Sequence, residues 1–495
     1  MHRAILAIDQ GTTSSRAVLF SQKGGVVSLQ QKELKLYFPK KGWVEQDAND
    51  IWEDTLQMCL AVLAANGMSA ADVATIGITN QRETTILWDK KTGEPVYNAI
   101  IWQDRRTTEL CNELKAKGFE GPVQEKTGLL LDPYFSATKI AWILDNVKGV
   151  RARAEKGEIA FGTVDSFLLW KLTDGKVHAT DITNASRTML YDIVEQQWDD
   201  SLLELFNIPP SVLPEVKDNV ADFGMTETNL FGKPIPINGI AGDQQAALIG
   251  QACFDEGMVK STYGTGCFLL MNIGSEFKTS KNRLLTTPAY RINGKITYAI
   301  EGAIFVAGAA IQWLRDSLDI IDDASETEDL AYSVKDNGGV SFVPAFTGLG
   351  APWWKPEAEA AIFGLTRDTT KAHIARAALE AQAYQTLDLM DAIKGDTGYS
   401  PDIIRVDGGL VNNKFMCQFL SDMLDSVVEL PVNTETTAQG AAYLAGLGAG
   451  VYTDLNDVKR RWDRDKRYKP DMEDKTRQTL YEQWTKSVKR VLYDG

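Results

Sequence analysis

Histidine is almost absent from this sequence, with three residues in 495, and none of them has other metal-ligating residues at ligand spacing. Histidine-based catalytic triads and zinc sites built from several histidines are therefore not expected. The sequence also contains no GxxxxGK[ST], GxGxxG, GxSxG or HExxH motif. The residue types left for chemistry are carboxylates, glycines, hydroxyls and arginines, which phosphoryl transfer uses for positioning and charge neutralisation.

Cysteine and long apolar runs are also scarce. The five cysteines are odd in number, widely spaced and without a C-x-x-C pair, so we expect a reducing compartment and neither a zinc site nor dithiol chemistry. The longest candidate for a membrane span, residues 299–314, is interrupted by Glu301. The apolar run at residues 4–8 is too short for a signal peptide. These features predict a cytoplasmic protein without stable membrane insertion.

Positive charge is in deficit, since the formal net charge is −15. This acidity disfavours nonspecific binding to nucleic acid or to an anionic membrane. Hydrophobic residues make up 44% of the chain and charged residues 24%, which is ordinary for a globular protein. At 495 residues the chain exceeds a single hydrophobic core, so we expect two large domains or several small ones.

The most informative stretch is residues 239–250, near the middle of the chain. An apolar strand, residues 235–240, runs into a glycine-flanked turn that presents Asp243, and an alanine-rich helix follows at once. Asp243 could simply cap that helix, since aspartate is a favoured N-cap. A carboxylate at the carboxyl end of a strand also lies where open α/β sheets bind ligands. We therefore interpret Asp243 as a base in a cleft between two halves of the chain.

Two strand–turn–strand segments carry polar, glycine-containing tips. The first joins strands at residues 4–8 and 17–20 through DQGTTSSR, and the second, residues 258–270, has a Gly-Thr-Gly tip. Such tips offer backbone N–H groups and hydroxyls to a phosphate, and Asp9 can hold magnesium through water. The alternative interpretation is a plain hairpin turn whose serine and threonine hydroxyls are solvated. Because each segment opens one half of the chain, the pair suggests an internal duplication with a nucleotide between the halves.

Other segments give weaker signals. Arg82, Glu83 and Trp102 follow buried strands, where they could line a polar pocket, although Arg82 and Glu83 could also be only a surface pair. Residues 183–187 are polar and loop-like, and we assign them no chemistry. Residues 302–314 predict a helix packed closely beneath a ligand. Further helices are expected at residues 47–66, 373–394 and 437–446, and residues 403–409 predict a strand that runs into glycines before a helix.

Taken together and in order, these motifs resemble the sugar and polyol kinase family, which shares the actin-like ATPase fold. The motifs that carry the resemblance are DQGTTSSR at 9–16, GITNQRE at 77–83, Trp102, DPY at 132–134, GIAGDQQ at 239–245, TYGTG at 262–266, Gly308 with Gln312, and DGG at 407–409. The resemblance covers essentially the whole length. It implies an α/β protein with two actin-like (ribonuclease H-like) ATPase domains, residues 1–251 and 252–495, and an interdomain cleft.

The resemblance further implies an enzyme, a kinase that uses ATP and Mg²⁺ to convert glycerol to sn-glycerol 3-phosphate, with Asp243 as the base. The first domain would hold the glycerol site and part of the phosphate site, and the second most of the nucleotide site. Residues implied for glycerol are Arg82, Glu83, Trp102, Tyr134, Asp243, Gln244 and Phe268. Residues implied for the nucleotide are Thr12, Thr13, Ser14, Arg16, Thr265, Gly308, Gln312, Gly409 and Asn413. Asp9 and Asp243 would hold the metal.

Some positions depart from the family pattern. Residues 226–232 contain no phosphorylatable histidine, and a loop for fructose 1,6-bisphosphate is not evident at residues 231–234. Lys355, Glu359 and Ala360 stand where the family usually has Asp, Arg and Gly. The resemblance implies a homo-oligomer, a dimer or tetramer, but the sequence determines neither its size nor its effectors. Two alternative functions are a kinase for another polyol or a ketopentose, and an actin-like ATPase without a small acceptor.

Overall fold

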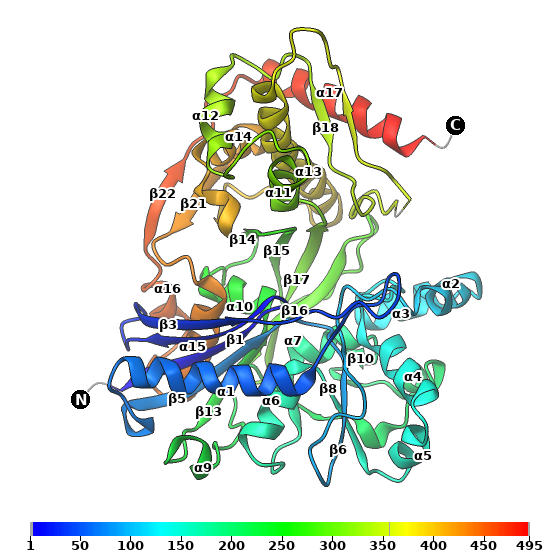
Figure 1. The fold of residues 1–495 in the computed structure, drawn as a ribbon, viewed down its shortest axis with the longest axis vertical. Coiled ribbons are helices and arrows are strands. Elements are labelled where there is room, and N and C mark those ends of the chain that lie inside the picture. The colour runs from blue at the N-terminus through cyan, green and yellow to red at the C-terminus, as the bar shows by residue number, and fades with distance from the viewer. Residues whose placement is uncertain (1–2, 356, 494–495) are drawn as a thin grey trace.

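The computed structural model describes residues 3–355 and 357–493, which form two lobes (Figure 1). One lobe is built on a five-stranded sheet with the order β13-β5-β1-β2-β3. Strands β1 (Ala4–Gln10), β2 (Ser14–Phe20) and β3 (Val26–Glu33) form an antiparallel meander. Strand β5 (Val73–Asn80) runs parallel to β1, and β13 (Ile237–Gly242) runs parallel to β5. The first predicted hairpin is therefore part of this sheet.

The other lobe is built on a seven-stranded sheet with the order β16-β17-β15-β14-β20-β21-β22. Its strands are β14 (Val259–Tyr263), β15 (Cys267–Gly274), β16 (Leu285–Ile292), β17 (Lys295–Ile304), β20 (Ile403–Asp407), β21 (Val427–Pro431) and β22 (Arg464–Tyr468). Here β14 takes the place of β1, because β15 and then β17 follow it antiparallel on one side while β20 and β21 follow parallel on the other. Five strands of the second sheet thus repeat the spatial order and the directions of the first sheet, as expected for an internal duplication, while β16 and β22 are added at its edges. The predicted α/β class is confirmed.

Helices from both halves of the chain cover the first sheet. Helix α1 (Ala48–Ala65) packs against β2 and β3, and Asp47 caps it by accepting a hydrogen bond from the Asn49 N–H at 2.8 Å. Helix α15 (Thr436–Gly448) packs against β1, β5 and β13. All seven residues of β1 are buried, because both faces of the strand are covered. The division of the chain into domains at 251 and 252 stays a prediction. Helix α15 follows that boundary in sequence but packs on the sheet that precedes it.

Helix α10 (Asp243–Gly250) crosses α15 at close range, so the two predicted halves meet through two helices. A Cβ at Gly250 would lie 1.9 Å from the carbonyl oxygen of Thr436. A Cβ at Gly440 would lie 1.8 Å from the carbonyl oxygen of Ala246. Only glycine fits at either position, since the neighbouring atoms belong to the backbone of the other helix.

The long insertion between β5 and β13 adds small sheets and helices beside the first sheet. Its sheets pair β6 (Ile86–Asp89) with β8 (Ile159–Gly162), β9 (Ala179–Asp181) with β12 (Glu215–Lys217), and β10 (Tyr191–Asp192) with β11 (Gln197–Trp198). Its strand β7 (Ala99–Ile100) pairs with β4 (Glu45–Gln46), which precedes β5 in the chain. Its helices are α2 (Thr108–Ala116), α3 (Glu120–Thr127), α4 (Ser136–Asn146), α5 (Val150–Glu155), α6 (Val164–Leu172), α7 (Ile182–Ala185), α8 (Asp200–Leu205) and α9 (Thr228–Phe231).

The second lobe is completed by helices around its sheet (Figure 1). These are α11 (Gly308–Asp316), α12 (Glu326–Ser333), α13 (Lys371–Thr397), α14 (Lys414–Leu424) and α17 (Asp474–Leu492), with a small sheet of β18 (Ser341–Val343) and β19 (Ala361–Phe363). The short helix α16 (Leu455–Lys459) instead lies beside α15 at the first lobe, where Val458 joins the apolar cluster of the first sheet. Within residues 3–355 and 357–493, no helix is both long enough and apolar enough to cross a membrane. All five cysteines are buried, free thiols.

Two expectations about local structure are wrong. Residues 302–304 belong to β17 and not to a helix, because they complete the antiparallel pairing with β15; α11 begins only at Gly308. Residues 183–187 are not a loop, because they form α7 and a 3-10 turn at Ser186–Thr188. The carboxylate of Asp181 stabilises the start of α7 by accepting hydrogen bonds from the backbone N–H groups of Thr183 and Asn184.

A buried carboxylate joins α13 to α17 and to the loop before residue 355. Asp388 accepts hydrogen bonds from the Tyr481 hydroxyl at 2.6 Å, the Trp484 indole at 2.9 Å and the Trp353 indole at 3.2 Å. All three donors are neutral, so no cation among them offsets the loss of water around the charge. Burial therefore raises the pKa of Asp388 to about 6.

This raised pKa predicts a pH-dependent contribution to stability. Aspartate in an unfolded chain ionises near pH 4, so the folded form alone keeps the Asp388 proton between about pH 4 and 6. Stability from this group is thus lost as pH rises through that window. Relative to wild type, Asp388→Asn should gain about 3 kcal/mol of unfolding free energy between about pH 4 and 7, measured by denaturant titration. A difference that does not change with pH would contradict this assignment.

Candidate active site

Asp243 stands where β13 ends and α10 begins. The residue before it must be glycine, because a Cβ at Gly242 would lie 2.7 Å from Cγ of Arg82. Gly242 is the N-cap, and Asp243 is the first helical residue, with Oδ1 accepting the Gln244 N–H at 2.7 Å. The Asp243 side chain is 30% exposed. Asp243 is therefore not the N-cap that the alternative interpretation required, and it can reach a ligand.

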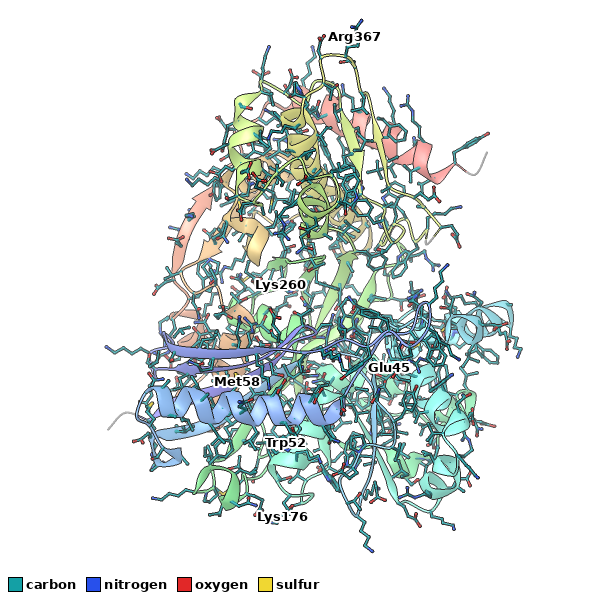
Figure 2. The ribbon with its side chains drawn as sticks, in the orientation of Figure 1. Glu45, Trp52, Met58, Lys176, Lys260 and Arg367 are labelled. Carbon is teal, nitrogen blue, oxygen red and sulfur yellow. The ribbon has the colours of Figure 1, made fainter. Side chains whose placement is uncertain are left out.

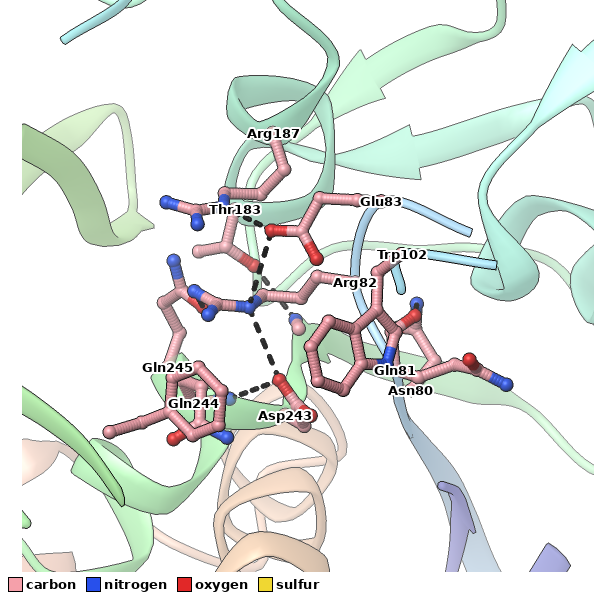
Figure 3. Close-up of polar contacts among 12 residues, drawn as sticks. Asn80, Gln81, Arg82, Glu83, Trp102, Thr183, Arg187, Asp243, Gln244 and Gln245 are labelled. Atoms are coloured by element: carbon pink, nitrogen blue, oxygen red, sulfur yellow. Dashed lines mark hydrogen bonds and ion pairs between the residues drawn. The ribbon is translucent and has the colours of Figure 1, made fainter. Parts of the chain in front are cut away.

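The Asp243 carboxylate is held by a buried arginine (Figure 3). Nε of Arg82 lies 3.2 Å from Oδ1 of Asp243. Burial raises the pKa of Asp243, while the charges of Arg82 and Lys260 oppose that rise. The carboxylate is thus partly desolvated and oriented, which suits a group that receives a proton.

Arg82 and Glu83 belong to a buried charge cluster and not to a surface pair, since they are 2% and 1% exposed. Nη1 and Nη2 of Arg82 donate to the two oxygens of Glu301 at 2.6 and 3.0 Å. Nε of Arg187 donates to Glu83 at 2.6 Å, and its Nη2 donates to Glu301 at 3.0 Å. Glu83 also has a φ of +63°, a strained conformation for a residue with a side chain. Packing and ion pairs therefore fix this cluster in place.

Three aromatic side chains from separate segments gather next to the charge cluster. The ring of Trp102 packs edge to face with Tyr134 at 5.7 Å and with Phe268 at 6.2 Å between centroids. The Trp102 indole also donates to Oγ1 of Thr12 at 2.8 Å. The structure thus brings these predicted substrate residues together with the tip of the first hairpin.

The sequence reasoning missed Lys260, which lies between the two lobes (Figure 2). The buried Nζ of Lys260 donates to Oε1 of Gln244, to Oγ1 of Thr262 and to the carbonyl oxygen of Phe268. Burial lowers the pKa of Lys260, partly offset by the nearby carboxylates of Asp407 and Asp243. Lys260 therefore joins the second sheet to α10. Its position two residues before the TYGTG motif was the one signal in the sequence that could have found it.

The tip of the first hairpin is solvent-accessible around a buried ion pair. Thr13 is exposed, and Thr12 and Ser14 are partly exposed. Asp9, 2% exposed, pairs with Arg16, whose Nη1 also lies 2.7 Å from Glu435. Burial raises the pKa of Asp9, and the Arg16 guanidinium opposes this. Much of the Arg16 fork is thus already occupied by protein carboxylates.

The second hairpin tip contacts the start of α11. The Gly308 N–H donates to the carbonyl oxygen of Gly264 at 2.9 Å, and a Cβ at Gly308 would lie 2.6 Å from that oxygen. Thr265 and Gln312 are exposed, and Gln312 stands one helical turn after Gly308. Three of the residues predicted for the nucleotide therefore adjoin one another.

The remaining predicted nucleotide residues lie after β20. Gly409 is exposed, and among the described residues no atom lies within 4 Å of where its Cβ would stand. Asn413 is mostly buried, with Oδ1 accepting the Met416 N–H at 2.9 Å and Nδ2 donating to Oγ1 of Thr327 at 3.1 Å. The side chain of Asn413 thus caps α14 and is committed to protein partners.

Two models of one protein family match the chain in succession. The N-terminal domain of the FGGY family of carbohydrate kinases matches residues 4–250, and its C-terminal domain matches residues 259–449. The chain belongs to the FGGY family of carbohydrate kinases. The predicted resemblance to sugar and polyol kinases is confirmed by these matches, as is the two-domain α/β fold.

Relatives of this FGGY kinase carry a more specific name. The glycerol kinase of Nitrosomonas eutropha is 64% identical over 99% of this chain and 98% of its own length. The glycerol kinase of Alcanivorax borkumensis is 60% identical over 98% of each chain. The crystal structure of Plasmodium falciparum glycerol kinase with ADP matches at a TM-score of 0.94 and 38% identity, covering 100% of this chain and 99% of that one.

Proposed function

We propose that this FGGY kinase transfers the γ-phosphoryl group of ATP to a terminal hydroxyl of glycerol, giving sn-glycerol 3-phosphate. The observation that carries the proposal is the partly exposed Asp243, held by Arg82 next to the aromatic group Trp102, Tyr134 and Phe268. A small triol needs both polar partners for its hydroxyls and flat apolar walls for its C–H groups. The names of relatives at 54–64% identity favour the same substrate.

In this proposal glycerol binds between the charge cluster and the aromatic group. Asp243, Gln244, Arg82, Glu83 and Tyr134 provide donors and acceptors for the three hydroxyls. Trp102 and Phe268 cover the carbon backbone. The carboxylates of Asp243 and Glu83 would accept hydrogen bonds from hydroxyls. Four of the five N–H groups of Arg82 already face Asp243, Gln245 and Glu301, so among the described residues only one N–H of Nη2 is left to donate to glycerol.

ATP would lie across the two hairpin tips. Thr12, Thr13 and Ser14 offer hydroxyls and backbone N–H groups to the phosphates, and Arg16 adds positive charge. Thr265, Gly308, Gln312, Gly409 and Asn413 would contact the rest of the nucleotide from the second lobe.

Magnesium is proposed at Asp9 and Asp243. The described residues contain no group of three or more His, Cys, Asp or Glu side chains able to hold a metal. Mg²⁺ that accompanies a nucleotide commonly uses only one or two carboxylates together with phosphate oxygens, so this sparse donor set fits it. The ion would neutralise charge on the transferring phosphoryl group.

Asp243 acts on the acceptor alcohol in this mechanism. Its carboxylate accepts a hydrogen bond from the terminal hydroxyl of glycerol and takes the proton as the γ-phosphoryl group arrives in line. Because phosphoryl transfer is loose, the alcohol need not be ionised beforehand. Alignment of the two substrates provides much of the rate enhancement, and closure of the lobes would keep water from attacking ATP.

The proposal includes a location and an assembly. The protein would act in the cytoplasm as a homo-oligomer, a dimer or tetramer, without nucleic acid partners. The domains would divide at 251 and 252, with glycerol bound mainly by the first and the nucleotide mainly by the second.

ATP consumption by the purified protein, measured with and without glycerol, tests the proposed function. Glycerol should stimulate consumption strongly, and xylulose at the same concentration should not. Stimulation by xylulose but not glycerol would favour the ketopentose alternative. Slow ATP hydrolysis that ignores both compounds would indicate an ATPase without a small acceptor.

Phe268→Ala should raise the KM for glycerol by about 10-fold, because the variant loses part of the apolar wall that covers the carbon chain. The KM for ATP should change little. Steady-state kinetics with each substrate varied in turn measure both values. Phe119→Ala, at an exposed position outside the proposed site, serves as the control and should leave both KM values unchanged. Equal effects on the two substrates would contradict a specific contact with glycerol.

A further inference from the structure

We propose that Glu301 is a positioning residue for the transfer reaction: from the second sheet, it fixes the Arg82 guanidinium that holds Asp243. This inference rests on the proposed function, since Asp243 is the base there. Glu301 does not itself face the substrate, because it is 1% exposed and lies behind Arg82.

The two oxygens of Glu301 determine how the Arg82 fork is oriented. Oε2 accepts from Nη1 at 2.6 Å, and Oε1 accepts from Nη2 at 3.0 Å. This bidentate geometry fixes the plane of the guanidinium group as well as its position. With both terminal nitrogens directed at Glu301, Nε is the nitrogen left to face Asp243, at 3.2 Å. The orientation of the base therefore depends on a carboxylate on the opposite side of Arg82.

Charge balance also makes Glu301 necessary. Arg82 and Arg187 are both buried, and each contacts Glu301. Burial alone would raise the pKa of Glu301, but the guanidinium groups of Arg187 and Arg82 outweigh it and lower the pKa to about 2. The two guanidinium groups thus stabilise the ionised form of Glu301. If Glu301 lost its charge, two buried cations, Arg82 and Arg187, would remain. Among the described residues, Glu83 would then be the fully buried carboxylate that still pairs with both of them.

Glu301 connects parts of the site that come from opposite halves of the chain. It lies in β17 and pairs with Leu270 of β15, the strand that also carries Phe268 two residues earlier. Arg82 closely follows β5 of the first sheet. The Glu301–Arg82 contact therefore connects Phe268, on the second sheet, with Asp243, at the end of β13 of the first sheet.

The test is Glu301→Gln, which keeps the size of the side chain and removes its charge. We expect kcat with glycerol to fall about 10-fold to 100-fold, the scale of a misplaced reacting group, while the KM for ATP stays near the wild-type value. Arg82→Lys should lower kcat by a similar factor. If Glu301 acts through Arg82, the double variant should be little worse than the poorer single variant.

Glu380→Gln is the matched control. Glu380 is also buried in the second half, where it pairs with Arg376 at 2.8 Å and accepts from Asn337 at 2.7 Å. Glu380→Gln removes a buried ion pair of the second half, as Glu301→Gln does, but it should leave kcat unchanged. If Glu301→Gln does not fold, Glu301→Asp keeps the charge and draws the carboxylate back by one methylene. This second variant should lower kcat about 10-fold.

Several results would overturn the inference. These are a folded Glu301 variant with near-normal kcat, an effect on KM alone, or multiplicative losses in the double variant. A fall in kcat for Glu380→Gln equal to that of Glu301→Gln would also overturn it, since the effect would then come from stability. Failure of the proposed function looks different, because wild type itself would then show no glycerol-dependent ATP consumption.

Discussion

Asp243→Asn should lower turnover with glycerol by about 100-fold or more, which is the usual scale for loss of a positioned base. Asparagine keeps the size of the side chain and can still accept the Gln244 N–H that Asp243 accepts at 2.7 Å. It cannot take a proton from the alcohol, and it removes the charge that faces Arg82. The KM for ATP should change less than kcat, since the proposed nucleotide contacts lie mostly elsewhere. Steady-state assays with each substrate varied will separate the two.

Asp200→Asn is the control for this variant. Asp200 is likewise the first residue of a helix, α8, but it is exposed and lies outside the proposed site. The Asp200→Asn variant should keep wild-type turnover. That result would show that losing a carboxylate from the first turn of a helix does not by itself lower activity. Turnover close to wild type in Asp243→Asn would remove Asp243 from the mechanism.

Gly440→Ala should destabilise the protein by about 3 kcal/mol, or prevent folding, in spite of the higher helix propensity of alanine. The new Cβ would lie 1.8 Å from the carbonyl oxygen of Ala246, and backbone atoms of α10 cannot move aside without shifting the helix. Because α10 begins at Asp243, any shift also moves the base. Denaturant unfolding measures the stability, and the activity of the folded fraction measures the displacement.

Gly395→Ala is the matched control, because Gly395 also lies within a helix, α13, but the atom nearest to its Cβ position is the side-chain Nδ2 of Asn282 at 3.0 Å and not backbone. A side-chain amide can move aside, so the higher helix propensity of alanine offsets the close contact and stability should change by less than about 1 kcal/mol. The two substitutions are chemically identical but should differ clearly in size. Equal effects would mean that the close approach of α10 and α15 carries no energetic weight.

Local patterns in the sequence were sufficient for much of the fold. The hairpin glycines, the apolar spacing of residues 47–66 and the strand before Asp243 all report structure within a few residues of themselves, so they could be interpreted without the rest of the chain. The five-strand arrangement that the two sheets have in common was visible only as two similar hairpin tips. The end of the antiparallel β17 was mistaken for a helix, because its glycine and alanine suit close packing in either element.

The missed part of the site consists of residues whose partners are distant in sequence. Arg187 and Glu301 are 114 residues apart, and each is buried only because the other cluster members neutralise it. A charged residue in isolation predicts solvent exposure, so the letters around Arg187 suggested a polar loop. Lys260 was missed for the same reason. Such compensation becomes evident only when the two sheets are placed next to each other.

The position of α15 bears on how the chain is made. The first sheet is complete once residue 242 has been synthesised, but the helix that covers β1, β5 and β13 begins at Thr436. At 5–20 residues per second, the ribosome needs about 10 to 40 s to supply it. During that interval the nascent first lobe exposes the apolar face that α15 later covers. This face includes Gly77, which lies against the backbone of Ala441 in the finished protein. We therefore expect an isolated fragment ending at residue 251 to aggregate unless a chaperone or a separately supplied second half covers that face.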